Sequence, residues 1–114
     1  MVDVSKNFNR SEFACKCGCG QDTIDAELVN ILQDCRDRFG PIRINSGNRC
    51  EAHNAKVGGT KNSQHLYGRA ADFVPLEASL DDVYNHLNIH YDGIGLGLYS
   101  GWLHVDSRGK KARW

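Results

Sequence analysis

Two histidines and one aspartate stand at positions where they could bind a divalent metal ion. The segment SQHLYGRAAD, residues 63–72, holds His65 and Asp72, and the later segment WLHVDSR holds His104. Two imidazoles and one carboxylate suit zinc and leave a fourth position for water, which is typical of catalytic sites. Water at such an ion ionises at about pH 7 and can attack an amide carbonyl. The pattern indicates hydrolysis; the competing interpretation is that these residues are surface groups or local caps.

Such a site needs strands that bring distant residues to one face. Successive side chains of a strand face opposite sides, so His104 and Asp106 would share a face of segment 102–107, while the apolar residues between them face the core. The segment AADFV, residues 70–74, predicts a second strand, which can place Asp72 on the same face.

The remaining elements predict an α+β fold, with a small antiparallel sheet and two to three helices. Apolar spacing, early acids and a closing Gly-Pro predict a helix in DAELVNILQDCRDRFG. Other expected elements are a strand at IRINS, a helical turn at CEAHNAKVGG, a helix at SLDDVYNHL capped by Ser79, and a hairpin of GIGLGLY and WLHVDS turning at Ser100-Gly101.

Length and charge restrict the class of protein. A chain of 114 residues fits a single domain, residues 1–114. Its 14 basic and 14 acidic residues cancel, so no global field favours nucleic acid or an anionic membrane. No apolar run approaches a membrane span, so we expect no membrane insertion, and we expect a monomer.

Five cysteines leave at least one thiol unpaired within the chain, and three of them crowd into CKCGCG as Cys15, Cys17 and Cys19. Three interpretations stay open. The thiols are reduced and packed as small hydrophobic groups, they form a thiolate metal clip, or one bridge joins this run to Cys35 or Cys50.

A family resemblance sharpens the metal hypothesis. Ser63, His65, Gly68, Ala70 and Asp72 match the S-x-H-x-x-G-x-A-x-D pattern of the zinc D-Ala-D-Ala carboxypeptidases, peptidase family M15. That family includes vancomycin-resistance D,D-peptidases, phage L-alanyl-D-glutamate endolysins and, remotely, the Hedgehog signalling domain. The segments NFNRSEFACKCGCG, INSGNRCEAHNAKVGGTKNSQH and LHVDSRGKKARW also resemble short, single-domain members. The resemblance implies a Hedgehog/DD-peptidase-like fold.

The resemblance also implies roles for individual residues. His65, Asp72 and His104 would bind Zn2+. Arg49, in SGNR, would bind the substrate carboxylate or polarise the scissile carbonyl, since its guanidinium offers a fixed fork of donors; a surface ion pair is the alternative. Ser63 would donate to substrate or steady a ligand, or make a plain turn hydrogen bond.

One position departs from the family pattern. Many members carry Glu or Asp three residues before the third zinc ligand as general base, and here that residue is Gly101. Asp106 is the first candidate replacement, because it shares the face of His104; its alternative role is to orient His104 or pair with Arg108. Further candidates are His53, His86, His90 and Asp92.

These residues predict a zinc metallopeptidase that cuts a bond involving D-amino acids in peptidoglycan stem peptides, as a D-Ala-D-Ala carboxypeptidase or an L,D/D,D-endopeptidase. A binding module without turnover is the first alternative, and a structural protein with metal on its cysteines is the second. The opening residues lack the apolar stretch of a signal peptide, so we expect cytoplasmic synthesis and action on the cell wall, through phage or prophage lysis-type export or in the host periplasm.

Overall fold

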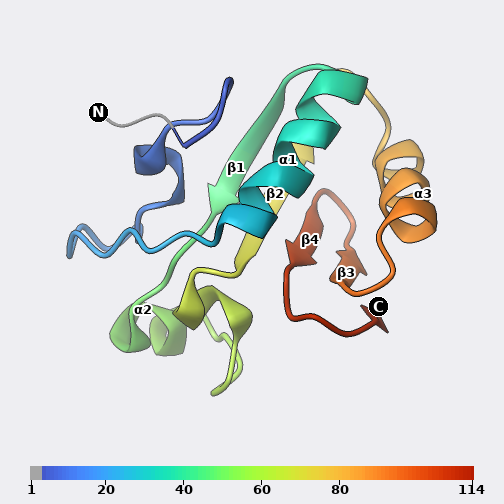
Figure 1. Cartoon of the computed structure of the whole chain (residues 1–114). Coiled ribbons are helices and arrows are strands. Elements are labelled where there is room, and N and C mark those ends of the chain that lie inside the picture. The colour runs from blue at the N-terminus through green and yellow to red at the C-terminus, as the bar shows by residue number, and fades with distance from the viewer. Residues whose placement is uncertain (1–3) are drawn as a thin grey trace.

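The computed structural model describes residues 4–114, which form three α-helices, two short 3-10 helices and a five-stranded sheet, confirming the α+β class (Figure 1). In chain order the elements are η1 (Arg10–Phe13), α1 (Ala26–Phe39), β1 (Ile42–Ser46), α2 (Glu51–Lys56), η2 (Gln64–Tyr67), β2 (Ala70–Pro75), α3 (Leu80–His90), β3 (Gly95–Leu98), β4 (Leu103–Asp106) and β5 (Ala112–Arg113).

The sheet has the strand order β1-β2-β4-β3-β5. Its neighbours are antiparallel except β3 and β5, which run parallel. In the pairing of β2 with β4, Asp72 lies directly opposite His104. Directly opposed residues on antiparallel strands bring their side chains together, so this register assembles the site.

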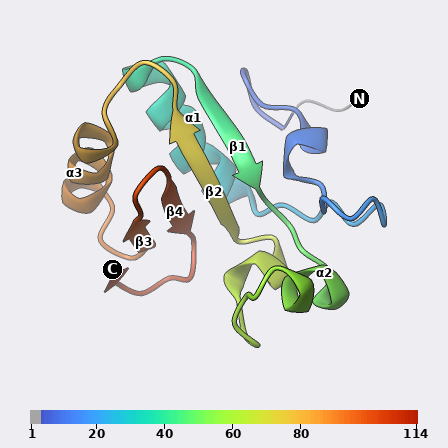
Figure 2. The same ribbon diagram turned by 180° about the vertical axis from the view of Figure 1, so that it is seen from behind.

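Helix α1 covers one face of the sheet, and the view from behind shows β1 and β2 in front of it (Figure 2). Its residues at helical spacing, Leu28, Ile31, Leu32 and Cys35, are buried in the core. Gly40 ends the helix with a φ of 85°. Burial of each large apolar side chain stabilises the fold by about 1.5–3 kcal/mol, which fixes the platform on which β2 carries Asp72.

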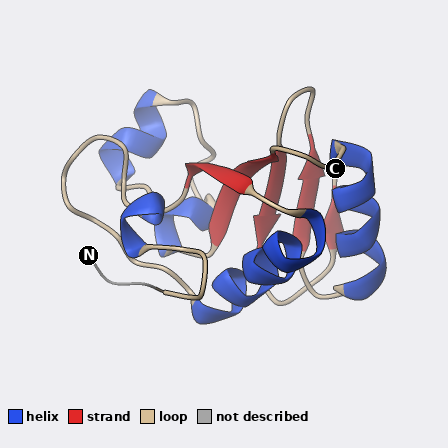
Figure 3. Ribbon diagram, turned by 90° about the horizontal axis from the view of Figure 1, so that it is seen from above, coloured by secondary structure: helices blue, strands red, loops and turns tan. Residues whose placement is uncertain are grey.

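Helix α3 lies beside the end of the sheet that holds β3 and β5 (Figure 3). The Ser79 hydroxyl accepts from the Asp82 backbone amide at 3.1 Å, which confirms the expected N-cap. Val83 and Leu87 are fully buried against the core.

The predicted hairpin is also confirmed, and its turn is closed by the Tyr99 amide donating to the Trp102 carbonyl at 3.0 Å. The structure adds β5, which the sequence did not reveal. Beyond it, the Leu98 amide donates to the Trp114 carbonyl at 2.8 Å, which holds the indole of Trp114 near the end of the sheet. Among residues 4–114, no helix is long and apolar enough to cross a membrane.

Candidate metal centre

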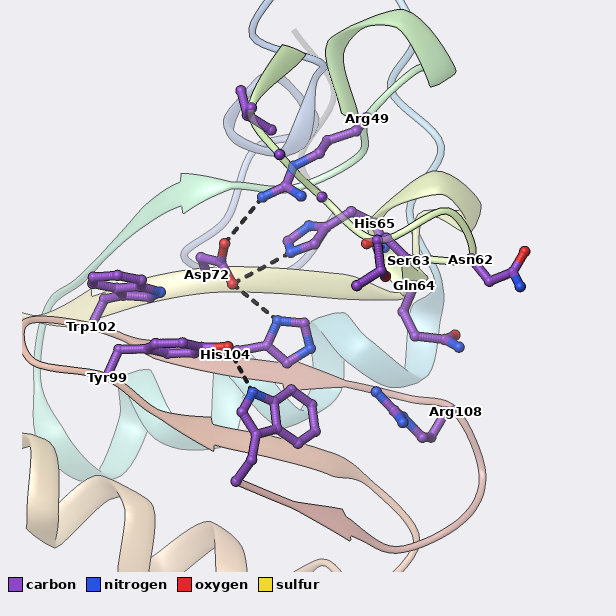
Figure 4. Close-up of a pocket in the computed structure, with 15 residues that line it drawn as sticks. Arg49, Asn62, Ser63, Gln64, His65, Asp72, Tyr99, Trp102, His104 and Arg108 are labelled. Atoms are coloured by element: carbon purple, nitrogen blue, oxygen red, sulfur yellow. Dashed lines mark hydrogen bonds and ion pairs between the residues drawn. The ribbon is translucent and has the colours of Figure 1, made fainter. Parts of the chain in front are cut away.

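The three predicted ligands converge at the bottom of a cleft. One ligand atom from each of His65, Asp72 and His104 lies within 4.8 Å of the others. Asp72 Oδ1 is 3.4 Å from His65 Nε2 and 3.0 Å from His104 Nδ1. Figure 4 shows both imidazoles pointing toward this carboxylate. The sequence predicted that His104 and Asp72 share one face of the sheet, and the structure brings His65 to the same place.

His65 is held by the backbone on its other side. Its Nδ1 lies 2.7 Å from the Gly47 carbonyl oxygen, which is a hydrogen-bond acceptor, so Nδ1 carries the proton and Nε2 turns to Asp72. The residue is 3% exposed and lies in η2, whose C-cap, Gly68, has a φ of 70°. A side chain at Gly68 would place its Cβ 2.4 Å from the Thr23 carbonyl oxygen, so this motif glycine is sterically required.

His104 is held by Asp106. Its Nε2 donates to Asp106 Oδ2 at 2.7 Å, which leaves Nδ1 directed at Asp72. Asp106 is fully buried, and Arg108 donates to it from Nε and Nη2, both at 2.8 Å. The absence of a side chain at Gly95 makes room for this carboxylate, since a Cβ there would lie 2.4 Å from its oxygens.

The carboxylates and the second imidazole shift each other's pKa. Burial raises the pKa of Asp72, but hydrogen bonds from His104 and His65 outweigh burial and hold it well below its usual range. Burial likewise raises the pKa of Asp106, but hydrogen bonds from Arg108 and His104 outweigh burial and hold this pKa well below its usual range. Burial lowers the pKa of His104, but hydrogen bonds to Asp106 and Asp72 raise it overall. The site therefore holds ionised carboxylates around an imidazole that binds a proton well.

The donor set fits a zinc ion. Each imidazole presents one nitrogen to the centre while an oxygen acceptor, from Gly47 or Asp106, fixes the other nitrogen. This outer arrangement is the usual one around zinc-binding histidines, and it sets the tautomer that metal binding needs. His65 Nε2, Asp72 Oδ1 and His104 Nδ1 are the atoms that would bind the ion.

Arg49 lies beside the centre. Its Nη2 is 3.3 Å from Asp72 Oδ2, the carboxylate oxygen that faces away from the imidazoles. Its Nε donates to the Ser46 hydroxyl and its Nη1 to the Asn54 amide oxygen, both at 3.2 Å. Three partners thus fix the guanidinium, and each terminal nitrogen keeps a second N–H for a substrate.

The cleft has a volume of about 540 Å³. One wall is aromatic, with Tyr99 stacked on Trp102 at a ring separation of 4.6 Å. Trp114 lies 5.1 Å from the His104 ring and donates from Nε1 to the Tyr99 hydroxyl at 2.7 Å. The opposite wall is polar and includes Ser63 (Figure 4).

Ser63 makes a local hydrogen bond, since its hydroxyl accepts from the His65 amide at 3.2 Å. This is the turn interaction that the sequence left as one alternative. The residue also lines the cleft, so its predicted role toward substrate stays a prediction.

The geometry favours the orienting role of Asp106 over the role of general base. Asp106 lies behind the His104 ring, pairs with Arg108 and does not line the cleft. Asp72 is the one carboxylate lining the cleft among residues 4–114. The other base candidates also lie outside it; these are His53, His86, His90 and Asp92.

Sequence reasoning missed three features of the site. Trp114 could not be assigned to the cleft because β5 is too short to give an alternating pattern. The alternate glycines in GIGLGLY were a signal that could have indicated close approach of other side chains to β3. They leave one face of β3 bare, and Asp106 and Trp114 occupy that space. The Gly47 carbonyl could not be predicted as the partner of His65, because every residue has a backbone carbonyl and the residue type gives no signal.

Comparison with known proteins agrees with the site. The sequence profile of the family described as Peptidase M15 matches residues 6–106. A zinc D-Ala-D-Ala carboxypeptidase of Streptomyces albus G is 49% identical over 43 residues, which cover 36% of this chain and 17% of that protein. The match therefore spans less than a fifth of the curated relative's length. Because the family profile extends over most of the chain, the chain belongs to the peptidase M15 family.

Proposed function

We propose that this chain is a zinc-dependent metallopeptidase that hydrolyses a peptide bond involving D-amino acids in peptidoglycan stem peptides. The observation that carries the proposal is the convergence of His65 Nε2, Asp72 Oδ1 and His104 Nδ1 at the base of an open cleft. Membership of a peptidase family supports the reaction type. The named activity of the Streptomyces relative supports the cofactor and the substrate class.

A bound zinc ion supplies Lewis acidity toward a carbonyl oxygen and lowers the pKa of a water molecule. The chain's own residues hold the metal-binding side chains in position. Gly47 and Asp106 hold the two imidazoles in one tautomer each, and Arg49 holds the second oxygen of Asp72. The stacked aromatic pair of Tyr99 and Trp102 offers a flat apolar surface for a peptide side chain.

Arg49 is the residue we assign to substrate binding. The guanidinium lines the cleft beside the metal centre, where its remaining N–H groups can bind a carboxylate or a carbonyl oxygen that gains negative charge. Binding a free C-terminal carboxylate would make the enzyme a carboxypeptidase. Binding an internal carbonyl would make it an endopeptidase of the endolysin type, acting on the cell wall.

A second candidate is a zinc-containing module that binds peptidoglycan peptides without cutting them. It is favoured by Gly101, which stands where many family members carry the general base, and by the lack of a spare carboxylate among the described cleft residues. Zinc and peptide binding with no cleavage would show that the chain is a binding module and not a peptidase.

The experiment incubates the purified chain with synthetic stem peptides ending in D-Ala-D-Ala, and with wall fragments, with zinc or with a chelator. Released D-Ala and new termini are measured by mass spectrometry. We expect cleavage with zinc that is lost in chelator and in His104→Ala, while His90→Ala, an exposed histidine outside the cleft, keeps full activity. Cleavage that survives zinc removal or the loss of His104 would refute the proposal.

A further inference from the structure

Four of the five cysteines gather at a place away from the cleft. The Sγ atoms of Cys15, Cys17, Cys19 and Cys50 all lie within 4.8 Å of one another. Three come from the loop before α1, and Cys50 is the N-cap of α2. None of the four lines the cleft that holds the histidines.

The distances between the sulfur atoms distinguish a disulfide from a metal-binding set of thiolates. They are 3.5 Å for Cys15–Cys17, 3.8 Å for Cys15–Cys50 and 3.7 Å for Cys17–Cys50. A disulfide needs an S–S distance of about 2.05 Å. Four thiolates at about 2.3 Å from a tetrahedral zinc ion lie about 3.8 Å apart, along the edges of the tetrahedron. These three distances match the edges of such a tetrahedron and are too long for a disulfide bond.

The backbone around the sulfurs also favours thiolates. The Cys50 amide donates to Cys15 Sγ, and the His53 amide donates to Cys50 Sγ, both at 3.4 Å. The Gly18 amide donates to the Cys15 carbonyl at 3.2 Å and closes the turn that returns the chain after Cys17. Amide donors directed at sulfur stabilise the ionised form that metals bind.

We propose that these four cysteines bind a second zinc ion in a closed, structural tetrathiolate site. Four protein ligands fill the tetrahedron and leave no position for water, so this ion takes no part in hydrolysis. The inference is independent of the proposed peptidase function.

The site joins the loop before α1 to the segment that carries Arg49. Cys50 follows Arg49 directly in the chain, and the Gln21 side-chain amide donates to the Arg49 carbonyl at 3.1 Å. The loop has no regular secondary structure between Ala14 and Asp25. A metal that links Cys50 to this loop would therefore hold the Arg49 backbone in place.

The test measures metal content and spectra in the full chain, purified under reducing conditions with zinc present. We expect about two zinc ions per chain in the wild type and about one in Cys17→Ser, in Cys19→Ser and in His104→Ala. Cobalt substitution should give thiolate-to-cobalt charge-transfer absorption in the near ultraviolet. This absorption should persist in His104→Ala and disappear in Cys17→Ser and Cys19→Ser. The matched control is Cys35→Ala. Cys35 is buried in the core away from the cluster, so this substitution should leave the metal content unchanged.

The outcomes separate the two metal sites. Failure of the peptidase proposal alone would leave the cysteine-bound metal in place. A wild-type content of one ion that His104→Ala removes, with no thiolate absorption, would overturn the second site. Disulfides among the four cysteines in protein kept reduced, detected by thiol counting and mass spectrometry, would overturn it as well. Folding of Cys17→Ser, checked by circular dichroism, ensures that lost metal is not a result of unfolding.

Discussion

Substitution of Asp106 by asparagine tests how the site is positioned. The buried carboxylate accepts from His104 Nε2 and Arg108 Nη2 on Oδ2, and from Arg108 Nε, the Arg108 amide and the Gly95 amide on Oδ1. All of these partners are donors. In Asp106→Asn an NH2 group replaces one oxygen, so it faces donors whichever way the amide turns.

The change should reach the metal through the tautomer of His104. An NH2 group at the Oδ2 position makes His104 Nε2 an acceptor and places the proton on Nδ1, which removes the lone pair aimed at the centre. With the amide turned the other way, a neutral oxygen replaces a carboxylate and the imidazole becomes a weaker ligand. Loss of such outer partners typically lowers metal affinity about 10–100-fold, or roughly 1.4–2.7 kcal/mol.

The fold should also lose stability, because Arg108 loses its counterion. Its side chain is 24% exposed and can regain water, so we expect the free energy of unfolding to fall by about 2–3 kcal/mol rather than by the larger cost of a fully buried charge.

The assay is competition for zinc with a chromophoric chelator at fixed pH, in a Cys17→Ser background so that the cysteine cluster does not contribute. Asp92→Asn is the matched control, since that side chain is 92% exposed and pairs only loosely with Lys111 at 3.8 Å. Equal zinc affinity in Asp106→Asn and Asp92→Asn would show that Asp106 does not position His104.

Three further predictions follow from the same geometry. Gly68→Ala should lower the free energy of unfolding by more than about 1–2 kcal/mol, because its backbone is left-handed and its Cβ would meet Thr23; chemical denaturation checks this against Gly101→Ala, which has open space and should be neutral. Zinc affinity should fall about tenfold per pH unit below the raised pKa of His104, because the proton and the metal compete for Nδ1; calorimetric titration across pH checks this, and a flat profile would contradict it. Phe73→Ala should destabilise by about 3–5 kcal/mol, since the ring is fully buried beneath the strand that carries the site, and a loss under about 1 kcal/mol would show a looser core.

Local patterns predicted the regular elements well. The spacing of Leu28, Ile31, Leu32 and Cys35 predicted the buried face of α1, and Ser79 predicted the start of α3. Alternation predicted that His104 and Asp106 share a side of β4, which their 2.7 Å hydrogen bond confirms. These are properties of a single helix or strand, so the sequence carries them directly.

Features that depend on pairing between distant segments could not be predicted from the sequence. The register that sets Asp72 opposite His104 comes from the packing of two strands. The burial of Asp106 depends on glycine in a neighbouring strand, and alternation alone could not decide whether its side chain faced the cleft or lay behind the His104 ring. The proposal for the cysteines likewise rests on the approach of Cys50 to the loop before α1, which the sequence does not show.

The central claim is that His65, Asp72 and His104 bind one zinc ion in the cleft, and a crystal structure of the zinc-loaded chain with anomalous scattering measured at the zinc edge tests it most directly. We predict a peak about 2.0–2.2 Å from His65 Nε2, Asp72 Oδ1 and His104 Nδ1. A zinc-loaded crystal with no anomalous peak among these three side chains would contradict the account.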